Sequence, residues 1–508
     1  MPSMPVSADL SDHAVQPTVN AGVTIPPAPH VQAVQRLKDL TQPLWDAYPE
    51  YLAAGLEIAM TSPAVAGEAG TWIRALRRYV NEAESPSVDL PSVDVVIFCS
   101  NFKPSYWPAL GQLADNLADA GYAVALILRT TIEIRTRGAK GRTVVQAVSK
   151  APYGRLRTLA FSEGQGRKNV WRGIRAAARL FVRGLLRDPA VARLVARNPA
   201  AIVSHLTMSA HRFDVARLLL DRLQPRLLVV NIERTPLGAE LVQSPARRGA
   251  LRVQICNEPP RHIIVPFLSE EVWVWNQLAA DLVEAVAPRS RTVVIGSNEV
   301  DVALQPPDPP GDAERALRDA AAGRPTLLLL SEYFPDAIFD AHERPLIIEE
   351  LRWLAEAARA HPGWFFIYRP RNERTAPPGW AQVEHLPNVT TSSPEIGYRQ
   401  FLAWDNLLAV GAVGSSGLFA AAGTGKTAIR LKVTDNRYCW PVIEQVSVTV
   451  HSPAELVNAI GRIDTTRSTR EVAPELASSF PFRGCTLQRM TDLCLDRLKA
   501  PGTRAQSA

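Results

Sequence analysis

Cysteine is scarce in this sequence, and its few copies are not arranged to bind a metal ion or to pair. The 508 residues include five cysteines, an odd number, with no CxxC motif and no Cys/His cluster. This spacing argues against a structural zinc site and a disulfide framework, and it predicts a reducing compartment. The five are Cys99, Cys256, Cys439, Cys485 and Cys494.

Long hydrophobic runs are also missing. No stretch of about 18 uninterrupted apolar residues occurs, so we expect no helix that crosses a membrane. The first 30 residues lack a basic start followed by an apolar run, which argues against a secretory signal. We therefore expect a cytoplasmic protein.

The sequence does contain enough apolar material for large cores. Hydrophobic residues make up 46% of the chain and charged residues 21%, as in globular proteins. At roughly 150 residues per domain, the length predicts about three domains rather than one. Residues 1–30, rich in Pro, Ser and Ala, are interpreted as a disordered arm, and residues 31–90 as a helical appendage.

The net charge of +6 hides an uneven distribution. Residues 131–200 hold sixteen basic and three acidic residues, a net +13, so the rest of the chain carries −7. One strongly basic segment in a mildly acidic chain predicts a local contact with an anionic partner.

After residue 90, short apolar runs alternate with amphipathic helices. A strand, a helix and a strand within about 35 residues form a βαβ unit, whose parallel strands require a crossover helix. We interpret residues 91–290 as a Rossmann-like α/β lobe with the basic segment 131–200 as a helical insertion. The predicted strands are 95–99, 123–128, 226–230 and 252–256, and the predicted helices are 107–120 and 236–249.

A second series of the same kind predicts another Rossmann-like lobe over residues 291–485, followed by a C-terminal helix and tail over 486–508. The fold class is therefore α/β, with two Rossmann-like lobes facing a cleft in which ligands are expected. The predicted strands are 293–296, 326–330, 364–368, 389–391, 407–410 and 428–433, and the predicted helices are 345–360, 395–402, 418–422, 453–463 and 487–498.

The sharpest local signal is the turn Gly414-Ser415-Ser416-Gly417, between a buried strand and a helix. Free backbone N–H groups at such a turn, with two serine hydroxyls, can bind a phosphate. The alternative is an ordinary turn in which one serine caps the helix.

A nearby segment, Gly423-Thr424-Gly425-Lys426-Thr427, resembles part of a P-loop. A P-loop needs a glycine at the position that Ala420 occupies, and it follows a strand and opens a helix. Here the segment follows a helix and precedes a strand, so we interpret it as a helix end capped at Gly423.

Two arginines, Arg369 and Arg371, directly follow the strand predicted at 364–368. A guanidinium at the carboxyl edge of a sheet can donate two hydrogen bonds to a phosphate or carboxylate. The alternative is a solvated pair in a loop.

These motifs together resemble the donor-nucleotide domain of glycosyltransferases with the GT-B architecture, particularly bacterial enzymes of capsule or lipopolysaccharide-type surface polysaccharides. Relatives that use cytidine-monophosphate sugars carry a Ser-Ser pair, here Ser415 and Ser416, and a His-Pro pair, here Arg369-Pro370. Ala420 fills the position of a ribose-binding glutamate in uridine-diphosphate relatives. The resemblance implies an inverting, metal-independent transferase with a nucleotide-sugar substrate and no cofactor.

An inverting transferase needs a general base on the acceptor side, because the acceptor hydroxyl loses a proton as it attacks. Glu233, Glu258 and His262 follow predicted strands of the first lobe and are the candidate bases, although each alone is more often a solvated or ion-paired side chain. The acceptor-side candidates after the first strand are Ser100, Asn101 and Lys103.

The basic segment contains one helix with an arginine face beside an apolar face. Such a helix can lie in a membrane interface against anionic lipids, or it can pack on the core with its arginines solvated. No nucleic-acid-binding motif accompanies the charge, so nucleic acid is not expected. The arginines are Arg172, Arg175, Arg179, Arg183 and Arg187.

Three hypotheses follow. The first is a glycosyltransferase that acts on a surface-glycan or lipid-linked acceptor, cytoplasmic or peripheral at the inner face of the membrane. The second is a sugar-nucleotide epimerase of the same architecture, which needs no acceptor. The third is a non-catalytic scaffold or binding protein with a decayed donor site.

Overall fold

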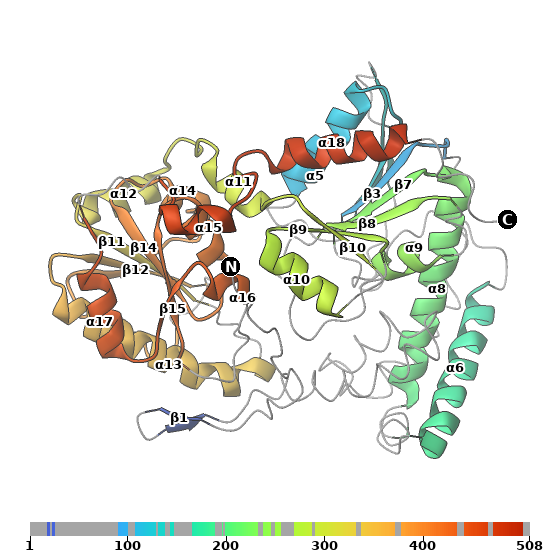
Figure 1. Ribbon diagram of the computed structural model, residues 1–508. Helices are drawn as coiled ribbons and strands as arrows, with labels where there is room; N and C mark the ends of the chain where they lie inside the picture. The colour runs from blue at the N-terminus through green and yellow to red at the C-terminus, as the bar shows by residue number, and fades with distance from the viewer. Residues whose placement is uncertain are drawn as a thin grey trace, which may run out of the picture. The chain divides into compact units, whose positions relative to one another are not determined.

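The structure is a computed structural model of the chain (Figure 1). The ranges that it describes are 18–20, 23–25, 90–99, 107–128, 131–137, 143–146, 165–187, 196, 199–231, 237–244, 249–255, 269–286, 290–331, 337–370, 377–433, 441–465 and 471–500. The helical appendage expected over 31–90 lies outside these ranges except for residue 90. Within the arm expected over 1–30, strands β1 (Thr18–Asn20) and β2 (Val23–Ile25) form an antiparallel pair.

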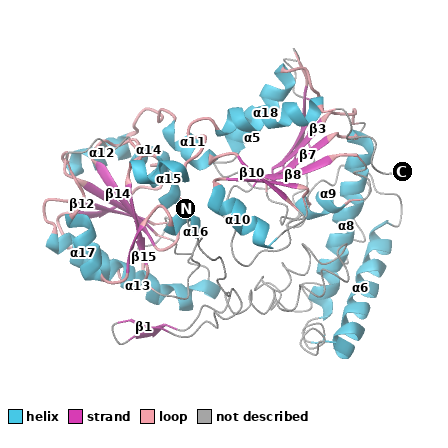
Figure 2. Ribbon diagram, viewed as in Figure 1, coloured by secondary structure: helices cyan, strands magenta, loops and turns pink. Residues whose placement is uncertain are grey.

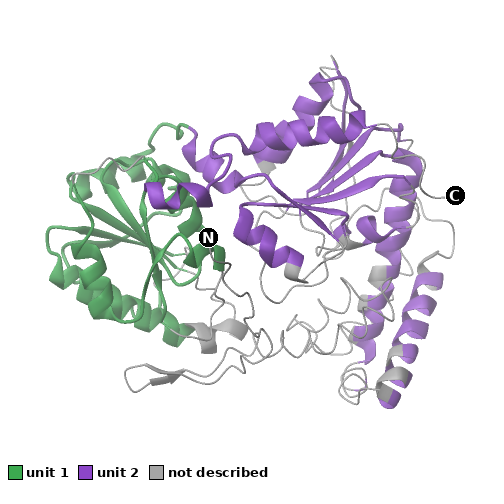
Figure 3. Cartoon of the chain, in the orientation of Figure 1, with its two compact units in different colours: residues 1–33, 306–472 green, residues 34–305, 473–508 purple. Residues whose placement is uncertain are grey.

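Two compact units divide the chain, as Figure 3 shows. One holds residues 1–33 and 306–472, and the other holds residues 34–305 and 473–508. We call them the nucleotide-fold unit, for its strand order, and the large-sheet unit.

The nucleotide-fold unit is built on a six-stranded, fully parallel sheet. Its strand order, β13-β12-β11-β14-β15-β16, corresponds to 3-2-1-4-5-6 in chain order, which is the order of Rossmann nucleotide-binding folds. The central strands are almost continuous apolar runs, because both of their faces are buried. The strands are β11 (Thr326–Leu330), β12 (Phe365–Arg369), β13 (Val389–Thr391), β14 (Leu407–Ala412), β15 (Thr427–Leu431) and β16 (Val448–Val450).

Helices cover both faces of this sheet (Figure 2). Leu327 and Leu329 of β11 share one core with Leu351 and Leu354 of α13. Because side chains alternate along a strand, Leu328 and Leu330 point to the opposite face. The helices are α12 (Asp312–Ala321), α13 (Ala337–Ala360), α14 (Tyr398–Leu402), α15 (Gly417–Gly423), α16 (Pro441–Glu444) and α17 (Pro453–Gly461), with a 3₁₀ turn η3 (Trp380–Gln382).

The large-sheet unit has eight strands in the order β10-β9-β8-β7-β3-β4-β5-β6. The pairs from β10 to β4 are parallel, and β5 and β6 are antiparallel additions at one edge. The strands are β3 (Val95–Cys99), β4 (Val124–Leu128), β5 (Thr131–Arg135), β6 (Thr143–Gln146), β7 (Leu227–Val230), β8 (Leu251–Ile255), β9 (Glu271–Val274) and β10 (Arg291–Val294).

This sheet has a separate core on each face. Alternate residues of β3, such as Val96 and Ile97, belong to different cores: Val96 packs with α8 and Ile97 packs with α5. The helices are α5 (Trp107–Asp119), α6 (Gln165–Arg187), α8 (Pro199–Leu223), α9 (Gly238–Gln243), α10 (Gln277–Val286), α11 (Asn298–Leu304) and α18 (Thr486–Lys499), with a 3₁₀ turn η4 (Pro474–Ser479). Two doubly wound α/β lobes, as the sequence predicts, are therefore present.

The boundary between the lobes differs from the prediction. The strand expected to open the second lobe is β10, which pairs with β9 at the edge of the large sheet. The unit boundary lies between residues 305 and 306 rather than at 291. An apolar run reveals a strand but not the sheet that it joins, because pairing depends on partners far away in sequence.

The C-terminal helix also returns to the large-sheet unit. Met490, Leu493 and Cys494 of α18 are buried in the same core as α5 and the sheet. The Nδ2 of Asn116 on α5 donates to the Oγ1 of Thr491 at 3.1 Å, and Arg497 pairs with Glu271 of β9 at 3.0 Å. Residues 473–500 thus complete the first lobe rather than extend the second.

The bounds of some helices and strands also differ from the predicted ones. Helix α13 starts at Ala337 and passes through Pro345, where the sequence predicts the helix to begin. Proline favours a helix start because it lacks an N–H, but it does not exclude helical residues before it. Strands β5, β6, β9 and β16 and helices α8, α10, α11, α12 and α16 were not predicted.

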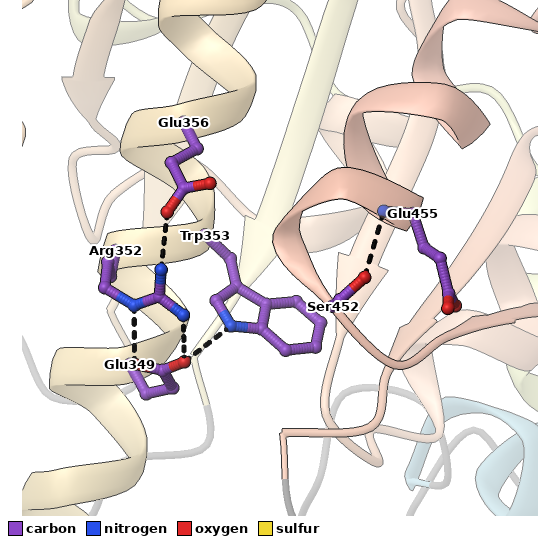
Figure 4. Close-up of polar contacts among 6 residues, drawn as sticks. All are labelled: Glu349, Arg352, Trp353, Glu356, Ser452 and Glu455. Carbon is purple, nitrogen blue, oxygen red and sulfur yellow. Dashed lines mark hydrogen bonds and ion pairs between the residues drawn. The ribbon is translucent and has the colours of Figure 1, made fainter. Parts of the chain in front are cut away.

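Helix α13 carries a compact ion-pair group on its surface (Figure 4). The guanidinium of Arg352 contacts the carboxylates of Glu349 and Glu356, each at 2.5 Å, and the indole N–H of Trp353 donates to Glu349 at 2.8 Å. The hydrogen bond from Arg352 lowers the pKa of Glu349 below its ordinary value, against the opposing effect of partial burial.

We predict that Met490→Ala destabilises the large-sheet unit by about 2–5 kcal/mol, because it leaves a cavity in a fully buried site. Urea unfolding measures the loss. The matched control is Gln488→Ala, exposed on the same helix, which should stay within about 0.5 kcal/mol of the wild type. A loss below 1 kcal/mol for Met490→Ala would contradict the docking of α18, by the same cavity scale.

We also predict that Glu349→Gln lowers the free energy of unfolding at pH 7 by about 1 kcal/mol, which is the typical net contribution of one hydrogen bond. Because the folded-state pKa of Glu349 is lowered, its contribution is present above its ordinary value of 4.5 and is lost as the pH falls through the folded pKa. Unfolding curves of mutant and wild type should converge in acid. Glu356→Gln, at a more exposed carboxylate, is the control and should cost less.

Candidate functional site

The strand order of the nucleotide-fold unit defines one place for a ligand. The chain runs from β11 outward through β12 and β13, and then returns to the other side of β11 as β14. Loops therefore diverge between the carboxyl ends of β11 and β14, and doubly wound sheets bind ligands at this switch point. We take this edge as the candidate site.

The serine turn lies at the switch point. Strand β14 ends at Ala412, which pairs with Leu330 at the end of β11, and α15 begins at Gly417. Gly414, Ser415 and Ser416 between them are partly exposed, whereas Phe419 within α15 is buried. The strand and helix on either side are thus fixed by the core, while the turn faces solvent.

The backbone amides at the start of α15 are already hydrogen-bonded, which differs from the prediction of free N–H groups. The amide of Gly417 donates to the Oγ of Ser415 at 3.2 Å, and the amides of Leu418 and Phe419 donate to the carbonyls of Ser415 and Ser416, each at 3.0 Å. In a short turn, local donors and acceptors satisfy one another. Ser415 thus caps the first amide, and Ser416 makes no side-chain cap bond.

Gly417 allows the turn to lie close to β11. A Cβ at this position would be 2.6 Å from the Cδ1 of Leu330 and 3.4 Å from the ring of Tyr398. The hydroxyl of Tyr398, on α14, donates to the carbonyl of Gly417 at 2.6 Å. The sequence offers no signal for Tyr398, since α14 reaches the turn only in the folded chain.

Arg369 ends β12 on the same edge. It pairs with Leu330, and its carbonyl accepts from the amide of Ser331 at 3.0 Å. The Nη2 of Arg369 donates to the carbonyl of Ile396 at 3.4 Å. Ser331, which directly follows β11, is buried at this edge and was not predicted as a site residue. Arg371 lies outside the described residues.

The P-loop-like segment is a helix terminator. The amide of Lys426 donates to the carbonyl of Ala421 at 2.9 Å, and that of Gly425 donates to Ala422 at 3.0 Å. Gly425 has φ of +89°, so this is a Schellman motif with the left-handed glycine at Gly425, not the predicted Gly423. The Nζ of Lys426 is buried and donates to the carbonyl of Trp404 at 2.8 Å.

Ala420 is buried in α15, where its carbonyl accepts from the Oγ1 of Thr424 at 3.0 Å. Its side chain therefore faces the core rather than the turn. This position therefore offers no polar group to the turn.

The large sheet has its own switch point, between β3 and β7. Phe98 pairs with Val230, and the Nδ2 of Asn231 lies 3.9 Å from the Sγ of Cys99. The strands that precede the acceptor-side and base candidates in sequence are therefore neighbours. The candidates themselves lie outside the described residues: Ser100, Asn101, Lys103, Glu233, Glu258 and His262.

The arginines of α6 do not form one continuous face. Arg172 is half-buried and pairs with Asp214 of α8 at 3.0 Å, so it belongs to the helix contact. Arg175 and Arg179 are exposed. The side chains of Arg183 and Arg187 are not described.

The described residues contain neither a metal-ion site nor a membrane-spanning helix. No group of three or more His, Cys, Asp or Glu side chains there could hold a metal ion. No helix there has the length and apolar content needed to cross a bilayer.

We predict that Gly417→Ala destabilises the nucleotide-fold unit by about 1–3 kcal/mol, because the new methyl group forces Leu330 to move within a packed core. Thermal or urea unfolding measures the loss. Gly363→Ala is the matched control, since a Cβ there meets nothing within 4 Å. Equal effects of the two substitutions would contradict the close approach.

No family model matches the chain, and no curated protein matches it. Among solved structures, a UDP-GlcNAc 2-epimerase from Methanocaldococcus jannaschii in complex with UDP-GlcNAc and UDP aligns at 11% identity and a TM-score of 0.44, covering 79% of this chain and 99% of its own. The trehalose-6-phosphate synthase OtsA aligns at 10% identity and a TM-score of 0.43, covering 80% of this chain and 99% of its own.

The wall teichoic acid polymerase TagF aligns at 10% identity and a TM-score of 0.41, covering 80% of this chain and 88% of its own. These likenesses are distant, and none assigns the chain to a family.

Proposed function

We propose that the nucleotide-fold unit binds the nucleotide of a sugar donor at the switch point between β11 and β14. The observation that carries this proposal is the meeting of two features at one sheet edge. The strand order is that of nucleotide-binding Rossmann folds. The serine turn follows β14 and Arg369 ends β12, and these two strands flank β11. Hydroxyls and a guanidinium are suitable donors to a diphosphate.

The position of the glycines favours a nucleotide sugar over a dinucleotide cofactor. Dinucleotide sites carry G-x-G-x-x-G after the first strand, so that the pyrophosphate contacts the backbone there. Here the residues after β11 are Ser331-Glu332-Tyr333-Phe334-Pro335, and the glycines follow the fourth strand, β14.

The hydrogen bonds that the turn amides already make affect which groups would contact the phosphate. Since the Gly417 amide already donates to Ser415, the phosphate would receive hydrogen bonds mainly from the hydroxyls of Ser415 and Ser416. Arg369 and Arg371 would offset the negative charge that develops on the leaving nucleotide. Gly414 and Gly417 would leave room for the phosphate.

We propose inverting, metal-independent transfer. An acceptor hydroxyl attacks the anomeric carbon, a base takes its proton, and the nucleotide leaves with the electron pair of the glycosidic bond. Glu233 or Glu258 would be the base, with His262 a third option. In the sequence they follow β7 and β8, which are adjacent strands near the switch point of the large sheet.

For the acceptor, we propose a bacterial surface glycan or a lipid-linked intermediate, used in the cytoplasm. Ser100, Asn101 and Lys103, which follow β3 in the sequence, would contact it. The +13 charge of residues 131–200 supports an acceptor or surface with negative charge.

A thermal-shift panel of UDP, CMP, CDP and GDP tests the donor site. We predict that one nucleotide stabilises the protein and that Ser415→Ala/Ser416→Ala abolishes both this shift and turnover of the nucleotide sugar. Each lost hydrogen bond to a charged phosphate costs about 1.5–3 kcal/mol. Ser393→Ala is the matched control, because its Oγ also accepts an amide two residues ahead, at 3.3 Å, but at the sheet edge beyond β13.

Three outcomes would contradict parts of the proposal. No shift with any nucleotide would favour a scaffold. Normal turnover in the double variant would remove the phosphate role of the serines. Interconversion of nucleotide sugars without any acceptor would identify an epimerase instead of a transferase.

A further inference from the structure

The outer face of helix α6 exposes large apolar side chains. Trp171 is 61% exposed, Leu185 60% and Leu186 78%. Val182 and Ile174 extend the same face. Single exposed apolar residues are ordinary, but a cluster of five on one helix marks an interaction surface.

The residues of α6 that the structure describes as buried have small or medium-sized side chains. Gly173 and Ala177 are buried, as is Asn169. A Cβ on Gly173 would lie 2.3 Å from the Oγ1 of Thr207 on α8, so the two helices approach closely at this point.

Basic side chains border the apolar residues. At 100° per residue, the exposed positions from Ile174 to Arg179 span about 140° of the helical wheel. Four apolar residues occupy one side of this face, and Leu186 lies among Arg175, Lys168 and Arg179 on the other. The sequence of α6 contains no acidic residue. Arg172 pairs with Asp214 of α8, so it is not counted among the basic residues of this exposed face.

We propose that this face of α6 binds the surface of a bilayer that contains anionic lipids. Its apolar side chains would enter the boundary between headgroups and acyl chains, and Arg175, Arg179 and Lys168 would contact phosphate headgroups. A second copy of the chain fits less well, because a two-fold contact would bring these basic residues toward one another. This inference goes beyond the proposed function and does not depend on the donor site.

Vesicle co-sedimentation tests the proposal with the full chain. Wild-type protein should bind vesicles of phosphatidylglycerol and phosphatidylcholine, should not bind pure phosphatidylcholine, and should lose binding as salt rises. Leu186→Ser and Trp171→Ser should each weaken binding by about 10–100-fold. Arg175→Gln and Arg179→Gln should weaken it by about fivefold each.

Matched controls lie in the other unit. Val448→Ser removes an apolar side chain that is 50% exposed, and Arg462→Gln removes an exposed charge; both should bind like the wild type. The α6 variants should keep the nucleotide-induced thermal shift, so failure of membrane binding is separable from failure of the donor site.

Two results would overturn the proposal. One is wild-type protein that stays in the supernatant with anionic vesicles, or α6 variants that bind them as the wild type does. The other is a dimer, seen by mass photometry without lipid, that Leu186→Ser converts to a monomer, since α6 would then contact a second copy.

Discussion

Parallel strand pairing is the constraint on which the candidate site depends. A parallel strand can join its neighbour only by crossing over a face of the sheet, so helices must cover both faces and all strands must end on one edge. When the chain turns back to the other side of β11, the loops at that edge separate. The place where β14 meets β11 therefore faces solvent although its walls belong to the buried core, and this combination allows a rigid turn to contact a ligand.

The serine turn shows how such a site is held. Its amides donate to Ser415 and Ser416 themselves, Gly417 lies against Leu330, and Tyr398 fixes the carbonyl of Gly417. These contacts leave little freedom to the backbone, so the turn is preorganised, and binding would lose less conformational entropy than a mobile loop would. Because these amides already have acceptors, the proposed phosphate contacts depend on the serine side chains rather than on the amides.

The large-sheet unit holds a concentration of charge and exposed apolar surface. The basic segment carries +13 in a chain with a total of +6, and α6 presents arginines beside exposed large apolar residues. A bilayer containing anionic lipids can pair with the arginines and also remove the apolar side chains from water. Water alone solvates the arginines but leaves the apolar side chains exposed. If both proposals hold, a donor site in one unit and a membrane surface in the other would serve a reaction on a lipid-linked acceptor.

The sequence by itself determined the α/β class, most strands of both sheets and the serine turn, because these depend on local periodicity and on the preferences of glycine and serine in turns. β11 and β13, for example, have the predicted bounds. Only the tertiary structure decided that β10 joins the large sheet and that α18 packs against α5. It also decided that Gly425 rather than Gly423 is the left-handed glycine after α15, and that Gly173 of α6 lies against α8. Strand partners, helix docking and the orientation of an amphipathic helix are set by contacts between residues distant in sequence, and local patterns do not encode them.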